Sequence, residues 1–163
     1  MRMNIDPKNI TIKFLVIGLL LVVMQPVHAL NAICVQQQQP VTLLEQIMKD
    51  RPVLVQLLTT AGYAPLLTGD APYTLLAPPE QDIKALKNES PEKIRAIMAG
   101  YILKGKHIEK SLKDGTKVET LAGTSLSIYR KDGHTLINGV RITHPDNDCK
   151  NGVIHGLAGA LNS

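Results

Sequence analysis

Four histidines in the second half of the chain are the side chains best suited to hold a metal ion or to transfer protons: His107, His134, His144 and His155. A zinc site requires converging ligands, commonly from closely spaced pairs, and no two of these histidines are closely spaced. The run HPDND, from His144 to Asp148, gathers nitrogen and oxygen ligands but lacks the longer ligand pattern of a calcium loop. Its turn-forming residues favour a polar loop before the last strand. The sequence therefore predicts no metal site and no other cofactor.

Nucleophilic catalysis would require a serine or cysteine beside a base and a group that orients the base. The sequence contains no G-x-S-x-G motif, in which a sharp turn exposes a nucleophilic serine. Ser125 lies in a run of alternating apolar and polar residues, which favours the polar face of a hairpin. We therefore expect a protein that is not an enzyme and has no catalytic residue. The alternative is a small-ligand carrier or hydrolase-type enzyme, which would need a groove where polar groups with perturbed pKa values converge.

The N-terminus predicts export. Three basic residues within residues 1–13 precede the uncharged apolar run Phe14–Met24, and Val27-His28-Ala29 follows. A basic region, a short apolar region and small residues before a cleavage point are typical of a secretory signal peptide. The alternative is a retained membrane anchor, but a spanning helix needs about 20 apolar residues. We expect residues 1–29 to be removed, and the mature protein to be secreted, periplasmic or at the cell surface.

Cys34 and Cys149 are the chain's two cysteines. An oxidising compartment favours a disulfide between them. Two free thiols remain an alternative, as does a lipid anchor on Cys34 with Cys149 free. Lipidation usually follows a small residue, whereas Ile33 stands before Cys34.

The net charge does not indicate a protein that binds nucleic acid. The whole chain carries +4, but without residues 1–29 it has 15 basic against 13 acidic residues. A modest basic run could hold an anionic glycan or a phospholipid surface; it consists of Lys104, Lys106, His107, Lys110, Lys113 and Lys117. Because Glu109 and Asp114 dilute it, a solvated face is the alternative. The candidate partner-binding residues are Tyr101, Lys104, Lys106, His107 and Lys110.

The elements that must position these residues divide into a helical first half and a strand-rich second half. After a polar linker at residues 30–40, a single domain is expected over 41–163. Thr42 and Glu45 form a capping-box pattern, and Ser90-Pro91-Glu92 is a helix start. A stripe after it should pack on the sheet, namely Ile94, Ile97, Met98 and Tyr101. The later pairs Asp132-Gly133 and Asn138-Gly139 predict hairpin turns, so the fold class is α+β with a mostly antiparallel sheet.

Two motifs resemble those of one family. Thr74-Leu75-Leu76-Ala77-Pro78, followed by a helix, resembles the first motif of fasciclin-like domains. Asn151-Gly152-Val153-Ile154-His155 resembles the second, and Asn138-Gly139-Val140 resembles the family's hairpin. The resemblance extends from about Val41 to Leu161.

The resemblance implies a wedge-shaped antiparallel β-sandwich with several packed helices. It implies that Thr74, Pro78, Asn151, Gly152 and His155 are structural, with the last strand in the interior and the ring nitrogens of His155 bonded to neighbours. It also implies adhesion or other binding, to an extracellular or envelope protein or an anionic glycan, with peripheral membrane contact as an option. Where the family often has Tyr-His, a pair linked to integrin contact, this chain has Tyr101-Ile102.

Overall fold

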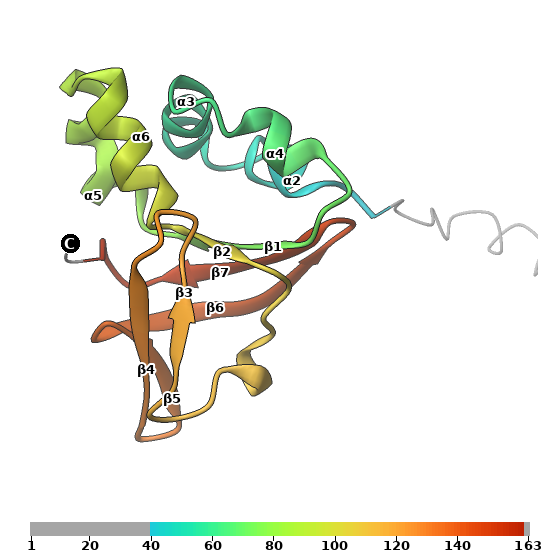
Figure 1. The fold of residues 1–163 in the computed structure, drawn as a ribbon, viewed down its shortest axis with the longest axis vertical. Coiled ribbons are helices and arrows are strands. Elements are labelled where there is room, and N and C mark those ends of the chain that lie inside the picture. Colours follow the sequence, from blue (N-terminus) through green and yellow to red (C-terminus); the bar gives the residue numbers. More distant parts are fainter. Residues whose placement is uncertain (1–39, 162–163) are drawn as a thin grey trace, which may run out of the picture. The chain divides into compact units, whose positions relative to one another are not determined.

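The computed structural model describes residues 40–161, so the expected signal peptide and almost all of the linker lie outside the described residues. A layer of helices covers one side of the central strands, and the remaining strands extend away from it (Figure 1). The helices are α2 (Leu43–Ile47), α3 (Pro52–Thr60), α4 (Ala64–Thr68), α5 (Glu80–Ile83), η2 (Lys84–Asn88), α6 (Pro91–Ala99) and η3 (Glu109–Ser111). The strands are β1 (Tyr73–Ala77), β2 (Ile102–Lys104), β3 (Lys117–Glu119), β4 (Ser125–Lys131), β5 (His134–Ile137), β6 (Val140–Cys149) and β7 (Gly152–Leu157).

The helix starts follow the sequence signals. Thr42 Oγ1 accepts a hydrogen bond from Glu45 N at 3.3 Å, and the Glu45 carboxylate accepts one from Thr42 N at 2.7 Å. This is the predicted capping box. At the start of α6, Ser90 Oγ accepts from Lys93 N at 3.3 Å.

The seven strands form one sheet in the order β2-β1-β7-β6-β5-β4-β3. Strands β1 and β7 pair in parallel, and the other described pairings are antiparallel. A bridge between Leu103 and Thr120 brings the two ends of the sheet together, which makes it nearly barrel-like. Every residue of β7 is buried, as expected for an interior strand. The α+β class with helices packed on a sandwich-like sheet is therefore confirmed.

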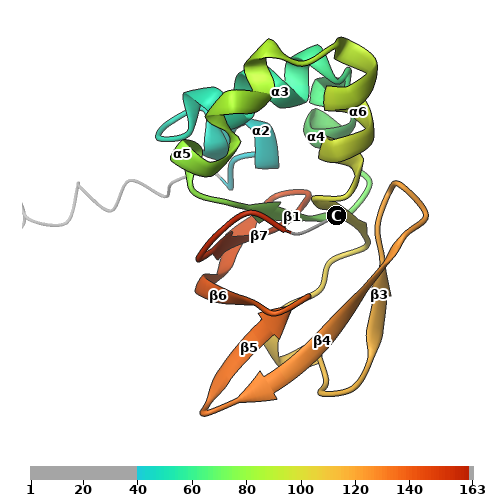
Figure 2. The same ribbon diagram turned by 90° about the vertical axis from the view of Figure 1, so that its left-hand side faces the viewer.

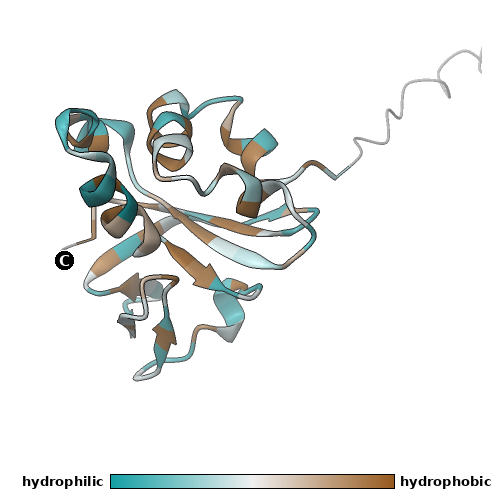
Figure 3. Ribbon diagram, turned by 45° about the horizontal axis from the view of Figure 1, so that its top comes forward, coloured by the Kyte–Doolittle hydropathy of each residue, from teal (hydrophilic) through white to brown (hydrophobic). Residues whose placement is uncertain are grey.

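The core lies between the helix layer and the sheet and continues inside the curved sheet, and the apolar parts of the ribbon face one another there (Figure 3). In the predicted stripe, Ile94, Met98 and Tyr101 are buried. Ile97 is only partly buried but also packs against this core. It lines a groove together with Leu126.

The predicted polar loop at residues 144–148 is also wrong, because these residues belong to β6. His144 pairs with Gly156 and Asn147 pairs with Ile154, so Pro145 and Asp146 together stand opposite His155. This extra residue is a β-bulge, which accommodates a proline that cannot donate a ladder hydrogen bond. The bulge also turns the Asp146 backbone to a φ of 55°.

Candidate functional site

His155 lies at the centre of the polar interior of the sheet. Its side chain is 0% exposed, its Nε2 lies 2.7 Å from the carbonyl oxygen of His107, and Asp146 N–H donates to its Nδ1 at 3.1 Å. These partners fix the neutral ring with its hydrogen on Nε2, because a carbonyl only accepts and an amide only donates. Burial lowers the pKa of His155, while the bond to His107 and the Asp146 carboxylate, 3.9 Å from Nδ1, act in the opposite direction. Both ring nitrogens are thus occupied by the fold, as the family resemblance implied.

Thr74, on the neighbouring strand β1, also bonds to the segment that contains His107. Its hydroxyl donates to Gly105 O and accepts from His107 N, both at 2.8 Å. Further along, Glu109 N donates to Asp146 Oδ1 at 2.7 Å. Residues 105–111, here called the strapped segment, are therefore held across β1, β7 and β6 by hydrogen bonds.

The other motif residues are also used inside the domain. The Asn151 side chain accepts from Leu43 N at 2.8 Å and donates to the carbonyls of Leu67 and Gly69 at 2.8 and 2.7 Å. It thereby ties α2 and the end of α4 to the turn before β7. At Gly152 any Cβ would overlap the carbonyl oxygen of Tyr73, so only glycine fits.

Pro78 supplies a carbonyl that accepts from Arg51 Nη1 at 3.0 Å, which joins the end of β1 to the start of α3.

The residues proposed for partner contact lie in different surroundings. Tyr101 is 4% exposed and its hydroxyl accepts from Leu161 N at 2.9 Å, so its ring belongs to the core rather than to a surface. Burial raises the pKa of Tyr101. Lys104 pairs with Glu119 at 3.5 Å, and Lys106 pairs with Asp148. The predicted basic run is therefore partly neutralised by acids that are distant in sequence.

Two further members of that run differ from the lysines. The His107 ring bonds through Nε2 to the carbonyl of Lys104 at 2.8 Å. Lys110 is exposed, and no ion pair joins it to another of residues 40–161. Beside it, Ile108 is 43% exposed.

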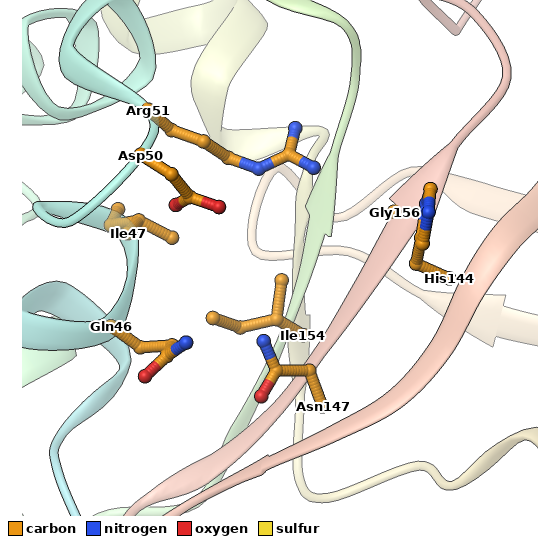
Figure 4. A pocket seen from close by; sticks show the side chains of 8 residues that line it. All are labelled: Gln46, Ile47, Asp50, Arg51, His144, Asn147, Ile154 and Gly156. Atoms are coloured by element: carbon orange, nitrogen blue, oxygen red, sulfur yellow. The ribbon is translucent and has the colours of Figure 1, made fainter.

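A polar pocket of about 210 Å³ lies between the α2–α3 region and strands β6 and β7 (Figure 4). Gln46, Asp50 and Asn147 project toward it, while the Arg51 guanidinium turns toward β1. His144 packs over Gly156, where an added Cβ would stand only 3.0 Å from the His144 Cβ. Sequence reasoning missed this pocket because its walls come from separate segments; the glycine within the apolar last strand was the available signal.

A larger groove of about 520 Å³ lies between α5–α6 and the β3–β4 turn. Apolar side chains dominate its walls, including Ile97, Leu86 and Leu126, and Tyr101 also lines it. Among residues 40–161 no cluster of three or more His, Cys, Asp or Glu side chains is arranged to hold a metal ion.

Comparison with known proteins identifies the family. The fasciclin domain family model matches residues 49–162. The chain belongs to the fasciclin domain family.

Relatives and a solved structure agree with this assignment. The chain is 34% identical over 103 residues to the transforming growth factor-beta-induced protein ig-h3 of Sus scrofa, a match covering 58% of this chain and 15% of that protein. It is 29% identical over 111 residues to protein sll1483 of Synechocystis, covering 63% of this chain and 61% of that protein. A FAS1 domain pair from the insect cell adhesion molecule fasciclin I superposes with a TM-score of 0.59 at 16% identity, covering 76% of this chain and 51% of that chain. The matches thus span less than two thirds of these relatives.

The two sequence motifs of this fasciclin domain supply side chains that bond within the fold. The first motif supplies Thr74 and the second supplies Asn151 and His155, and each of these side chains makes internal hydrogen bonds. Among residues 40–161 no helix is long and apolar enough to cross a membrane.

Proposed function

We propose that this fasciclin domain is an exported binding module, which acts by adhesion or another contact with an extracellular or envelope macromolecule rather than by catalysis. The observation that carries the proposal is the use of the motif's polar side chains. His155 is the natural candidate for a catalytic base, yet both of its ring nitrogens are bonded inside the fold. We therefore expect the protein to act through binding by its surface side chains. The comparison with an insect cell adhesion molecule supports a binding role.

The proposed compartment follows from the N-terminus. Removal of residues 1–29 would deliver the domain to the periplasm, the cell surface or the medium. Mass spectrometry of exported protein should find a chain that begins at or near Leu30. A membrane-bound protein that keeps Met1 would contradict this.

A disulfide between Cys34 and Cys149 is part of the proposal. Lys150 N donates to Val41 O at 2.8 Å, so the start of the domain lies beside the residue that follows Cys149. Cys149 is buried next to this contact, and Cys34 lies outside the described residues. Thiol counting on denatured, freshly exported protein should find no free thiol.

The binding proposal is tested with the exported mature protein applied to immobilised matrix or envelope fractions. Saturable retention above that of an unrelated domain of the same size supports it. Retention equal to that of the unrelated domain overturns it.

A second candidate function is small-ligand carriage, favoured by the groove of about 520 Å³ with mostly apolar walls, a volume in the usual range for ligand sites. Native mass spectrometry should then show a bound apolar molecule that is lost in an Ile97→Trp variant, because the indole would fill the groove. A ligand-free wild-type protein would count against carriage.

A further inference from the structure

Strands β3 to β6 present an outer face that no described element covers. The pairing places Tyr129 opposite Leu136 and Leu136 opposite Arg141, which makes one row across three strands. Lys131 pairs with His134 in the next outward-facing position, and Lys117 lies on β3 with the same orientation. Six side chains make up this outer face: Lys117, Tyr129, Lys131, His134, Leu136 and Arg141.

The alternation of burial shows which way these side chains point. Leu126, Ile128 and Ile137 occupy the alternate positions and are buried at 6%, 0% and 0% exposure. Because successive side chains of a strand point to opposite faces, the row that contains Tyr129 points to solvent. Tyr129 is 52% exposed. Figure 2 shows the β4–β5 hairpin at the end of the domain away from the helices.

The cations of the outer face differ from Lys104 and Lys106, which pair with acids. Lys117, Lys131 and Arg141 are exposed, and no ion pair joins them to another of residues 40–161. The acid on the same side of β3, Glu119, is paired with Lys104 at 3.5 Å. Asp132, which directly follows Lys131, lies in the β4–β5 turn at the edge of the outer face.

We propose that the outer face is a binding site for an anionic polysaccharide. This inference rests on the proposed function and names its partner. A sugar ring carries an apolar C–H face, which can stack on the exposed Tyr129 ring, and carboxylate or sulfate groups at its rim, which fit the flanking cations. The row from Tyr129 to Arg141 spans two strand spacings, about 10 Å, a length comparable to a disaccharide.

Other anionic partners fit the outer face less well. A protein interface normally has an apolar core of several side chains, whereas this face has an exposed Tyr129 and a half-buried Leu136. Nucleic acid would require a larger basic surface along a groove. Peripheral membrane contact favours a larger buried apolar area.

The test measures binding of the exported mature protein to four probes, each at low and at raised salt. Polygalacturonate and dextran sulfate test carboxylated and sulfated polysaccharides, neutral dextran of matched size tests the need for charge, and a DNA duplex tests for general polyanion binding. We expect binding to at least one of the two charged polysaccharides, weakened by salt, with much weaker binding to neutral dextran and the duplex. Tighter binding of polygalacturonate would indicate recognition of carboxylate groups, and tighter binding of dextran sulfate would indicate recognition of sulfate groups.

Variants then locate the site. Tyr129→Ala should weaken polysaccharide binding about tenfold, the scale of an interface residue worth about 1.4 kcal/mol. Lys131→Gln combined with Arg141→Gln should weaken it at least as much. Met48→Ala removes an apolar side chain that is 62% exposed, and Lys87→Gln removes an exposed cation; both lie in the helix layer and should leave binding unchanged.

Several results would overturn the inference. Binding to neither charged polysaccharide would do so, and a positive adhesion result with matrix or envelope fractions would then leave the proposed function standing. Equal binding of the DNA duplex would mean a general polyanion surface. Equal losses in the Met48 and Lys87 controls would place the site elsewhere, provided that all variants keep the unfolding midpoint of the wild type.

Discussion

The two groups of basic side chains in this domain differ in their surroundings. In the strapped segment and the strand before it, Lys104 and Lys106 pair with Glu119 and Asp148, and the backbone of the segment is bonded to Thr74 and His155. On the outer face, Lys131 and Arg141 lie across the strands from His134 and Leu136 and have no acidic partner among residues 40–161. The charges of the first group are paired within the domain, while those of the second are the ones we propose to contact a partner. A basic run in sequence therefore does not identify a basic surface; pairing in three dimensions does.

This difference predicts that stability and binding respond to different substitutions. The largest effect is expected at His155. His155→Ala should lower the free energy of unfolding by about 3–5 kcal/mol, because it leaves a cavity and two unpaired backbone groups. His134→Ala, an exposed histidine on the outer face, is the matched control and should change it by less than about 0.5 kcal/mol. Urea unfolding measures the free energy of unfolding of both variants. Equal losses in the two would contradict a special structural role for His155.

Thr74→Val should have the next largest effect. The change keeps the side-chain shape but removes the hydroxyl between Gly105 O and His107 N, so we expect a loss of about 1–3 kcal/mol. Hydrogen exchange should become faster in residues 105–111 before it does in the helices. Thr60→Val, at an exposed helix end, is the control. Unchanged exchange in the strapped segment would mean that Thr74 does not hold it.

The pH dependence of stability tests the neutral state of His155. Burial lowers the pKa of His155 below its ordinary value of 6.5, so the unfolded chain binds a proton more readily than the folded one. Stability should therefore be fully present above pH 6.5 and should fall as the pH drops from there toward the folded pKa. The slope from this group is at most about 1.4 kcal/mol per pH unit. Urea unfolding between pH 5 and 8 should show the slope in the wild type and not in His155→Gln.

The smallest effect is expected from the paired lysines. Lys106→Gln removes an exposed ion pair with Asp148, which is worth about 0.2–1 kcal/mol. Lys131→Gln removes a cation that pairs with no acid in the described part of the chain, and it should change stability even less. Raised salt should reduce the difference in free energy of unfolding between the two variants. A cost above about 2 kcal/mol for Lys106→Gln, well beyond that range, would show that the strapped segment depends on this pair.

The sequence predicted those parts of the fold whose signals are local. The Thr42–Glu45 capping box, the Asn138-Gly139 hairpin and the buried last strand each depend on a few adjacent residues. The β6 bulge was missed because Pro145 and Asp146 have the composition of a loop, and only the partner strand shows that they continue the sheet. Ile97 packs against the core but is less buried than Ile94 and Met98, and helical periodicity along α6 did not show that its side chain would line a groove.

The surface was harder to predict, because it depends on pairing across the chain. Lys104 and Lys106 find their acids 15 and 42 residues away, so their neutralisation leaves no local pattern. The cations of the outer face are separated in sequence and become neighbours only through the strand register. Tyr129 carried no sequence signal of its own beyond its place in an alternating strand.

Two double variants compared in one binding assay distinguish the outer face from the paired lysines as the place of contact. Lys131→Gln with Arg141→Gln removes charge from the outer face, and Lys104→Gln with Lys106→Gln removes the same charge from the paired group. Binding of the exported protein to the matrix or envelope fraction that retains it should fall about tenfold or more in the first and stay near the wild-type value in the second, with all proteins folded. Loss of binding in the second variant, with the first unaffected, would contradict the account and place contact at the basic run of residues 104–110.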